Sequence, residues 1–313
     1  MRRYLVTGGA GFIGSHIVES LVKKGHFVRV LDNFIRGKRE NLRAVCKDVE
    51  VVRGDIRSQE VCRRATKRIE VVFHQAALRS VPQSMRVPAE YNAVNISGTL
   101  NLLEASLQNK VRRVIFASSS SVYGDVPVFP QKESFLPQPV SHYALTKLVG
   151  EHYCKIYNGH YGLETVALRY FNVFGPRQSL DDEYAIVIPK FIDCMLRKKS
   201  PPIFGNGRQS RDLVFIDNVV QANLRAADRY CVDGGVFNVA SGNDTTILEL
   251  VAILNKIMHT NIKPVFMQKR PGDVFKTLAD LSLARKAIGY TPCVEFSQGL
   301  MQTVKYFKSR VVI

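Results

Sequence analysis

Residues 7–14 read Thr7-Gly8-Gly9-Ala10-Gly11-Phe12-Ile13-Gly14, a glycine-rich turn that directly follows the apolar run Arg3–Val6. Apolar residues then recur at helical spacing as far as Val22, and Gly25 ends the pattern. A strand, a glycine turn and a helix in this order form the fingerprint of a dinucleotide-binding site. The glycines allow the backbone to approach a pyrophosphate, which lies at the positive N-terminus of the helix.

The second expected strand, Phe27–Leu31, supports this interpretation because Asp32 follows its end. A carboxylate at this distance from the glycine turn is placed to bind the adenosine ribose diol. Its negative charge would repel a 2′-phosphate. The sequence therefore predicts NAD as the cofactor in preference to NADP.

Strands and helices continue to alternate through the first half of the chain. Further strands are expected at 49–52, 71–73 and 113–117, and helices at 59–66 and 87–109. This alternation is typical of an α/β fold with a Rossmann-type, doubly wound parallel sheet. Ligands bind such sheets at the carboxyl ends of the strands, which draws attention to Asp55, His74, Arg79 and Ser118–Ser121. Taken alone, His74 is interpreted as a hydrogen-bonded turn residue.

The strict alternation ends after Gly175, and a mixed pattern begins. Helices are expected over 185–199, 218–229, 247–258 and 296–307, with strands over 213–215 and 236–239. We interpret residues 1–170 as an NAD-binding domain and residues 171–313 as a smaller mixed α/β lobe that binds the substrate. The boundary is approximate, and we expect the chain to be interleaved between the two.

Composition narrows the class of protein. The 313 residues are 46% hydrophobic and 23% charged, which is typical of a globular protein. No apolar run of about 20 residues predicts a membrane span, and the first strand starts too early for a signal peptide, so a cytoplasmic location is expected. The cysteines are scattered without a C-x-x-C pair, so we expect no metal site.

The net charge of +17 first suggests nucleic acid as a partner. Lysines and arginines are nevertheless spread in small groups with no basic motif interleaved with aromatic residues, and an anionic small substrate explains them at least as well. We expect binding neither to nucleic acid nor to a membrane.

A second motif, Tyr143-x-x-x-Lys147, begins the helix expected after the fifth strand. The two side chains project from one helical face, one turn apart. Alone, this spacing is more often a solvated face. A fixed ammonium would favour the phenolate and lower its pKa, so Tyr143 would take a proton from a substrate alcohol while Lys147 holds the nicotinamide ribose. Together with the glycine turn and Asp32, the pair favours the catalytic interpretation.

The chain resembles the extended short-chain dehydrogenase/reductase family, and within it the nucleotide-sugar 4-epimerases, over essentially its whole length. Besides the glycine turn and the Tyr143–Lys147 pair, the resemblance rests on His74-Gln75-Ala76-Ala77, Asn95-Ile96-Ser97-Gly98-Thr99, Ser119–Gly124, Leu168–Arg177, Gly207–Asp212 and Arg270-Pro271-Gly272-Asp273.

This resemblance implies roles for the matching residues. The catalytic residues would be Tyr143, Lys147 and Ser119, with Ser120 and Ser121 leaving the register of the hydroxyl open. The residues implied at NAD are Gly8, Gly11, Phe12, Ile13, Gly14, Asp32, Asn33, Asp55, Ile56, Gln75, Ala76, Ala77, Arg79, Asn95, Tyr143, Lys147 and Tyr170. The residues implied at the substrate are Ser119, Ser120, Ser121, Tyr143, Asn172, Val187, Ile203, Phe204, Arg211, Arg270, Asp273 and Thr277.

Two serines bear on the type of reaction. Sugar-nucleotide 4,6-dehydratases resemble this chain but carry adjacent acidic residues just before the Val-Tyr-Gly turn, and UDP-glucuronate decarboxylases place a glutamate immediately before its valine. Here these positions are Ser120 and Ser121. The resemblance therefore implies oxidation and re-reduction at one carbon, which is epimerisation.

The resemblance also implies a substrate. Pro202–Phe204 matches a segment that holds uracil, and Arg211 and Arg270 match arginines that clamp a pyrophosphate. Thr277 stands where epimerases limited to glucose and galactose carry a bulky tyrosine, so it leaves space for a 2-acetamido group.

We therefore expect a C4 epimerase of UDP-GlcNAc and UDP-GalNAc, and also of UDP-Glc and UDP-Gal, that keeps NAD bound and forms a homodimer through the long helices. A UDP-glucuronate 4-epimerase, another NAD-dependent nucleotide-sugar oxidoreductase and a non-catalytic NAD-binding scaffold stay open as alternatives.

Overall fold

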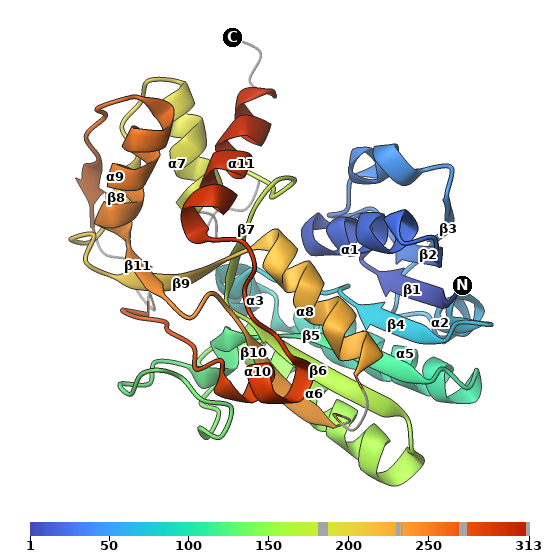
Figure 1. The fold of residues 1–313 in the computed structure, drawn as a ribbon. Helices are drawn as coiled ribbons and strands as arrows, with labels where there is room; N and C mark the ends of the chain where they lie inside the picture. The colour runs from blue at the N-terminus through green and yellow to red at the C-terminus, as the bar shows by residue number, and fades with distance from the viewer. Residues whose placement is uncertain (181–186, 230–231, 233, 269–273, 311–313) are drawn as a thin grey trace.

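The computed structural model describes residues 1–180, 187–229, 232, 234–268 and 274–310. At its centre is a seven-stranded sheet in the order β10-β6-β5-β4-β1-β2-β3 (Figure 1). Every neighbouring pair of these strands is parallel. The strands are β1 (Arg3–Thr7), β2 (Phe27–Asp32), β3 (Val49–Arg53), β4 (Val71–His74), β5 (Arg113–Ser119), β6 (Glu164–Tyr170) and β10 (Gly235–Val239).

The strand order reverses at β1, because the chain first adds β2 and β3 on one side and then returns to add β4 on the other. This reversal is the switch point at which doubly wound sheets open a ligand crevice. The predicted Rossmann-type fold is confirmed.

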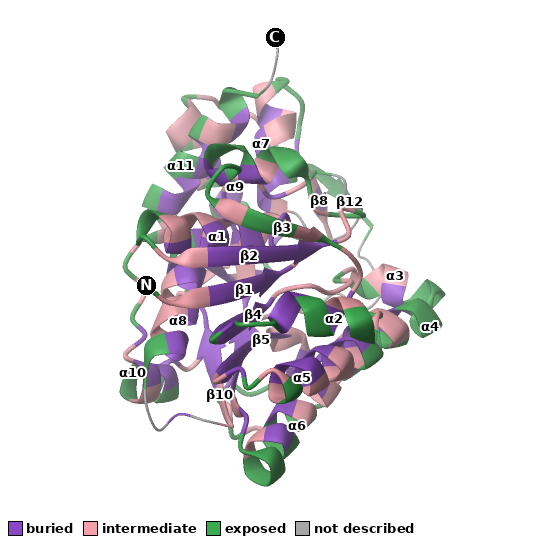
Figure 2. Cartoon of the chain, turned by 90° about the vertical axis from the view of Figure 1, so that its right-hand side faces the viewer, coloured by how far each residue is buried: buried purple, intermediate pink, exposed green. Residues whose placement is uncertain are grey.

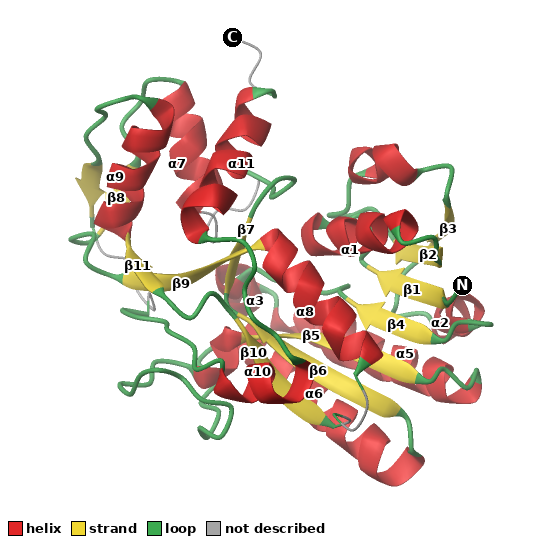
Figure 3. Cartoon of the chain, viewed as in Figure 1, coloured by secondary structure: helices red, strands yellow, loops and turns green. Residues whose placement is uncertain are grey.

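Helices cover both faces of the large sheet (Figure 3). Helices α1 and α8 pack together on one face, while α2, α5 and α6 pack on the other. The helical segments of this part are α1 (Phe12–Lys23), η1 (Arg39–Val45), α2 (Gln59–Thr66), α3 (Val81–Arg86), α4 (Pro88–Tyr91), η2 (Asn92–Ser97), α5 (Gly98–Gln108), η3 (Ser120–Tyr123), α6 (His142–Tyr161) and α8 (Ile216–Asp228).

Because both faces are covered, the central strands are buried along their length, whereas the edge strand β3 keeps exposed residues (Figure 2). This burial explains why β1, β4 and β5 consist of near-continuous apolar runs with no alternation of polar residues.

The second half of the chain builds a smaller lobe and also returns to the large sheet. Its mixed sheet has the order β11-β9-β7, and β8 pairs with β12. The elements are β7 (Asn172–Phe174), α7 (Val187–Leu196), β8 (Pro202–Phe204), β9 (Ser210–Phe215), β11 (Asp244–Thr246), α9 (Ile247–Met258), β12 (Val265–Met267), α10 (Ser282–Ile288) and α11 (Phe296–Lys308). Since β10 joins the large sheet beside β6, the chain crosses between the two parts, and a division at residue 170 stays a prediction.

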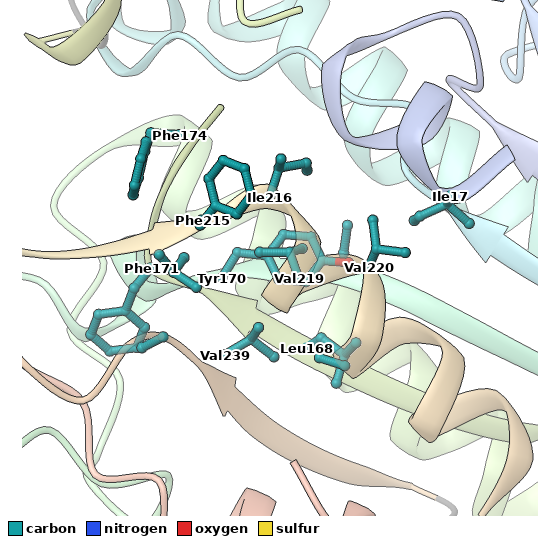
Figure 4. Packing of buried hydrophobic residues seen from close by; sticks show 14 of the residues in the cluster. Ile17, Leu168, Tyr170, Phe171, Phe174, Phe215, Ile216, Val219, Val220 and Val239 are labelled. Carbon is teal, nitrogen blue, oxygen red and sulfur yellow. The ribbon is translucent and has the colours of Figure 1, made fainter. Parts of the chain in front are cut away.

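One hydrophobic cluster extends from the large sheet into the smaller lobe (Figure 4). Helix α8 contributes Val219, which packs in the same cluster as Ile17 of α1, Leu168 of β6, Phe174 of β7 and Val239 of β10. Burial of apolar surface is the main favourable term in folding, so this shared core holds the lobe against the carboxyl ends of the strands.

The helix expected over 87–109 is divided. A π-helical segment, Asn92–Ser97, separates α4 from α5, and such segments are rare and occur frequently at functional sites. The helix expected over 185–199 is described as α7 from Val187, and residues 185–186 lie outside the described part. Among the described residues, no helix combines the length and apolar character that a membrane span requires.

Candidate active site

A cavity of about 620 Å³ lies at the carboxyl ends of the central strands of the large sheet. Its wall brings together most of the residues expected at NAD. These are Gly8, Gly11, Phe12, Ile13, Gly14, Asp32, Asn33, Asp55, Ile56, Gln75, Ala76, Ala77, Arg79, Tyr143, Lys147 and Tyr170.

The glycine turn has no room for side chains. A Cβ on Gly14 would lie 2.2 Å from the backbone oxygen of Gly8, and a Cβ on Gly8 would lie 2.8 Å from the backbone nitrogen of Ala76. Helix α1 begins at this turn with Gly11 as its N-cap, and no side chain caps it. The first N–H groups of α1 therefore suit an anionic group such as the pyrophosphate of NAD.

Asp32 is buried in the cavity wall with a fixed orientation. Its Oδ2 accepts a hydrogen bond of 2.9 Å from Ala10 N–H, and its Oδ1 accepts one of 2.8 Å from Phe34 N–H. Burial raises the pKa of Asp32, and the two backbone donors oppose that rise. The carboxylate is held where a ribose diol would meet it.

Asp55 lies farther along the same wall and is held ionised. The Arg57 guanidinium donates to both carboxylate oxygens at 3.0 and 2.8 Å, and Asn33 Nδ2 donates at 2.9 Å. These bonds, led by that of Arg57, lower the pKa of Asp55 to about 2. An adenine amino group would therefore meet a charged acceptor.

Tyr143 and Lys147 lie on the first turns of α6, whose N-cap Ser141 accepts a hydrogen bond of 3.1 Å from Ala144 N–H. Lys147 Nζ lies 5.9 Å from the centroid of the Tyr143 ring and donates to the backbone oxygen of Ala117 at 2.7 Å. Burial lowers the pKa of Lys147 to about 8.

The direction of the Tyr143 pKa differs from the sequence-based expectation. Burial raises it, while a hydrogen bond with Ser119 and the charge of Arg79 partly oppose the rise. The expected lowering of the Tyr143 pKa is therefore wrong, because desolvation of the phenolate outweighs the opposing hydrogen bond and charge.

Within the serine run, Ser119 is the residue whose side chain opposes the rise in the pKa of Tyr143. Ser119 Oγ accepts from Ser121 N–H at 3.2 Å and from Ser121 Oγ at 2.9 Å, so its own proton is available for the tyrosine oxygen. Ser118 points elsewhere, because its hydroxyl donates to the buried carboxylate of Glu151.

Asn95 stands behind the cavity wall and does not line it. Its Oδ1 accepts from Leu78 N–H at 2.8 Å, and its Nδ2 donates to the Leu78 oxygen at 2.9 Å and to Thr146 Oγ1 at 3.0 Å. The side-chain amide is thus used within the protein. Asn95 positions Leu78, which does line the cavity.

Asn172 and Thr277, two of the residues expected at the substrate, lie in contact. Asn172 Nδ2 donates to Thr277 Oγ1 at 3.1 Å, and Thr277 Oγ1 also accepts from the backbone N–H of Asp212 at 3.1 Å. These positions come from β7, β9 and the segment after residue 273, which only the folded lobe brings together.

The structure also describes four further residues expected at the substrate, which are Arg211, Ile203, Phe204 and Val187. Arg211, on β9, donates to the backbone oxygens of Ser210 and Phe275. Ile203 is only 1% exposed, so a ligand would meet its backbone, whereas Phe204 and Val187 are half-buried. Two further positions, Arg270 and Asp273, lie outside the described residues.

Comparison with known proteins decides the family. The model of the NAD dependent epimerase/dehydratase family matches residues 4–240. The chain belongs to this family. The predicted family, the NAD cofactor and the character of an enzyme are thereby confirmed.

Solved structures of this epimerase/dehydratase family resemble the chain over its full length. UDP-N-acetylglucosamine 4-epimerase from Methanobrevibacter ruminantium M1, in complex with UDP-N-acetylmuramic acid, is 41% identical, with a TM-score of 0.95 and 99% of each chain covered. UDP-glucose 4-epimerase from Thermotoga maritima, with UDP-glucose, is 40% identical, with a TM-score of 0.93 over 98% of this chain and 99% of that chain.

A similar sequence is a putative UDP-glucose 4-epimerase of Methanocaldococcus jannaschii, 38% identical over 307 residues, which are 97% of this chain and 98% of that protein. Other matches carry the names of UDP-glucuronate 4-epimerases and UDP-sugar decarboxylases. The names of these relatives therefore differ both in the reaction and in the sugar.

Sequence reasoning missed two polar residues of the site. Asn223 of α8 accepts from the Tyr170 hydroxyl at 2.9 Å, and Gln75 Nε2 donates to the same hydroxyl oxygen at 3.1 Å. Asp212 is fully buried, and its carboxylate accepts from Ser241, Gly242 and Ala279. For Asn223 no local signal existed. For Asp212 the signal was an acidic residue directly before the apolar run Leu213–Phe215.

Proposed function

We propose that this protein is an NAD-dependent UDP-sugar 4-epimerase that interconverts UDP-GlcNAc and UDP-GalNAc, and also UDP-Glc and UDP-Gal. The observation that carries the proposal is the cavity at the carboxyl ends of the central strands, whose wall contains Tyr143 and Lys147 together with the glycine turn and Asp32. Ser119, at the carboxyl end of β5, is the proposed hydroxyl donor beside Tyr143. Ser120 and Ser121 supply no acid for elimination.

Tyr143 accepts the proton of the sugar C4 hydroxyl. Ser119 donates to the same oxygen, and Lys147 holds the nicotinamide ribose. When bound, NAD⁺ supplies a hydride acceptor, so that C4 is oxidised and then reduced with no net consumption of cofactor. Tyr143 returns its proton to the same oxygen after the sugar has presented its other face.

The arrangement of the smaller lobe supports tight binding of UDP and loose binding of the sugar. Arg211 provides a planar cation for the diphosphate, and β8 provides an edge for uracil. Because the sugar must turn about its diphosphate linkage, strong contacts to it would hinder the reaction.

The choice of an N-acetylated sugar rests on Thr277. The Thr277 side chain is small, and its hydroxyl oxygen accepts hydrogen bonds from Asn172 Nδ2 and Asp212 N–H. The space that a bulkier side chain would fill at this position is therefore left for a 2-acetamido group.

We further propose a cytoplasmic homodimer that pairs through α5 and α6. Helix α6 exposes the apolar side chains of Leu145, Ile156 and Tyr161, which supports a partner on this side. Sedimentation of the pure protein tests the dimer.

The test of the activity uses the pure protein without added cofactor. UDP-GlcNAc, UDP-Glc and UDP-GlcA are incubated separately, and the products are resolved by chromatography. We expect the C4 epimers of the first two donors. Absence of an epimer from every donor overturns the epimerase assignment. An epimer from UDP-GlcA alone overturns the argument from Thr277.

A further inference from the structure

A buried ion pair lies directly behind the Tyr143–Lys147 pair. Glu151, one turn after Lys147 on α6, is 5% exposed, and Arg169 of β6 is 3% exposed. Arg169 Nε and Nη2 donate to the two carboxylate oxygens at 2.9 and 2.7 Å. Desolvation offsets most of the attraction in such a pair, so stability alone is a weak reason for it.

The carboxylate of Glu151 also holds the end of β5. It accepts a hydrogen bond from the Ser118 hydroxyl, and Ser118 lies between Ala117 and Ser119. Lys147 Nζ donates to the Ala117 oxygen at 2.7 Å. Lys147 and Glu151 lie one turn apart on the same face of α6. They thus bind the backbone of Ala117 and the side chain of Ser118, the two residues before Ser119.

Arg169 connects the same pair to the turn after β5. Its guanidinium carbon lies 4.7 Å from the centroid of the Tyr123 ring. The Tyr123 hydroxyl in turn donates to Asn238 Oδ1 of β10 at 2.7 Å. Arg169 therefore has a second neighbour, Tyr123, besides Glu151.

Lys147 is surrounded by groups from four elements. They are Tyr143, Glu151 and Cys154 on α6, Phe116 and Ala117 on β5, His74 on β4, and Arg169 on β6, which lies behind Glu151.

Most of these groups are neutral. Burial and the charge of Lys147 lower the pKa of His74 to about 3, so its imidazole is uncharged near neutral pH. Burial raises the pKa of the Cys154 thiol, so it stays protonated. Among these described neighbours, Glu151 is the carboxylate that opposes the desolvation of the Lys147 ammonium.

We propose that Glu151 is a positioning residue of the epimerase site, which keeps Lys147 charged and orients Ser118 so that Ser119 faces Tyr143. The inference rests on the proposed function, since its main readout is turnover.

The sign of the effect follows from the charges. Burial already lowers the pKa of Lys147 to about 8, and Glu151 acts against that lowering. Removal of the carboxylate charge lowers the lysine pKa further. The ammonium is then lost at a lower pH, and the alkaline limb of the activity profile moves to lower pH with it.

The experiment compares the alkaline limb of the pH profile of kcat/KM for the NAD-loaded protein and its variants. Glu151→Gln keeps the size and the acceptor for Ser118 but removes the charge. We expect the limb to move down by about one pH unit or more. Glu164→Gln is the matched control, because Glu164 pairs with Arg112 and Arg113 at the opposite end of β6 from the cavity. The alkaline limb of the kcat/KM profile of Glu164→Gln should stay at the wild-type pH.

Glu151→Gln leaves Arg169 buried without its counter-charge and is expected to lower the unfolding temperature. The double variant Glu151→Gln/Arg169→Met removes both charges and is expected to regain stability, with a limb displaced less than that of Glu151→Gln because a positive charge is lost as well. A limb at the wild-type pH in folded Glu151→Gln overturns the inference and assigns the pair a structural role only.

Failure of the proposed function is recognised separately, because wild-type protein would then give no epimer from any UDP-sugar. In that event the variants are compared by the pH dependence of the fluorescence of bound NADH, which reports the charge beside the nicotinamide ribose without turnover. A shift in Glu151→Gln supports the inference there too, and an unchanged profile overturns it.

Discussion

Lys147 Nζ donates a hydrogen bond of 2.7 Å to the backbone oxygen of Ala117, although 30 residues separate the two in the chain. This bond ties the helix that carries Tyr143 to the strand that ends at Ser119. An ammonium has three donors, so two remain for groups in the cavity. The lysine thus contributes to the geometry of the site as well as to its charge.

Replacement of Tyr143 by phenylalanine removes the proposed base and leaves the cavity shape unchanged. We expect kcat to fall by about 10²–10⁴-fold, the usual contribution of general acid–base catalysis. NAD should be retained and released on denaturation in the wild-type amount. Tyr161→Phe, at the exposed end of the same helix, is the control and should keep full activity. Equal activity of the two variants would contradict the role of Tyr143.

Thr277→Tyr fills the space proposed for the 2-acetamido group. Turnover of UDP-GlcNAc should fall much more than turnover of UDP-Glc, and the ratio of the two kcat/KM values measures the effect. Thr277→Ser keeps the hydroxyl that receives Asn172 Nδ2 and should preserve the wild-type ratio. Parallel losses on both donors would show that Thr277 does not select the sugar.

Asp32→Asn tests the choice of dinucleotide. One of the two backbone donors, Ala10 N–H or Phe34 N–H, would then face an amide N–H₂ group, and the charged acceptor for the ribose is lost. Hydrogen bonds to charged groups contribute about 1.5–3 kcal/mol, so NAD affinity should fall by about tenfold to a hundredfold. Affinity for NADP should fall less. Titration with the two reduced cofactors, followed by fluorescence, gives both constants.

Acid sensitivity is expected at Glu19 of α1. Burial alone would raise the pKa of Glu19, but hydrogen bonds from Lys23 and Arg177 lower it to about 2. A carboxylate whose folded-state pKa is lowered stabilises the fold above its unfolded value of about 4.5, and this contribution is lost as the pH falls toward 2. Thermal unfolding between these pH values should be less pH-dependent in Glu19→Gln. An equal pH dependence of the unfolding temperature in wild type and in Glu19→Gln would contradict the lowered pKa of Glu19.

Elements with local signals were predicted well from the sequence. Helices α2 (Gln59–Thr66) and α9 (Ile247–Met258) begin and end where their periodicity indicated, and each has a side-chain N-cap in Ser58 or Thr246. The glycine turn was predictable because only glycine fits where a Cβ would collide with backbone. The π-helical segment over Asn92–Ser97 was missed, because one extra residue in a turn leaves little trace in the apolar spacing.

The alternation of strands and helices, the glycine turn, the Tyr143–Lys147 spacing and the family resemblance could be read from the sequence alone, since these depend on neighbours along the chain. Only the tertiary structure shows that Ser118 binds Glu151, that Asn95 supports the wall from behind, and that Glu151 lies buried against Arg169. It also reversed the direction of the Tyr143 pKa. Desolvation depends on which atoms surround a group, and those atoms come from strands and helices that are distant in the chain.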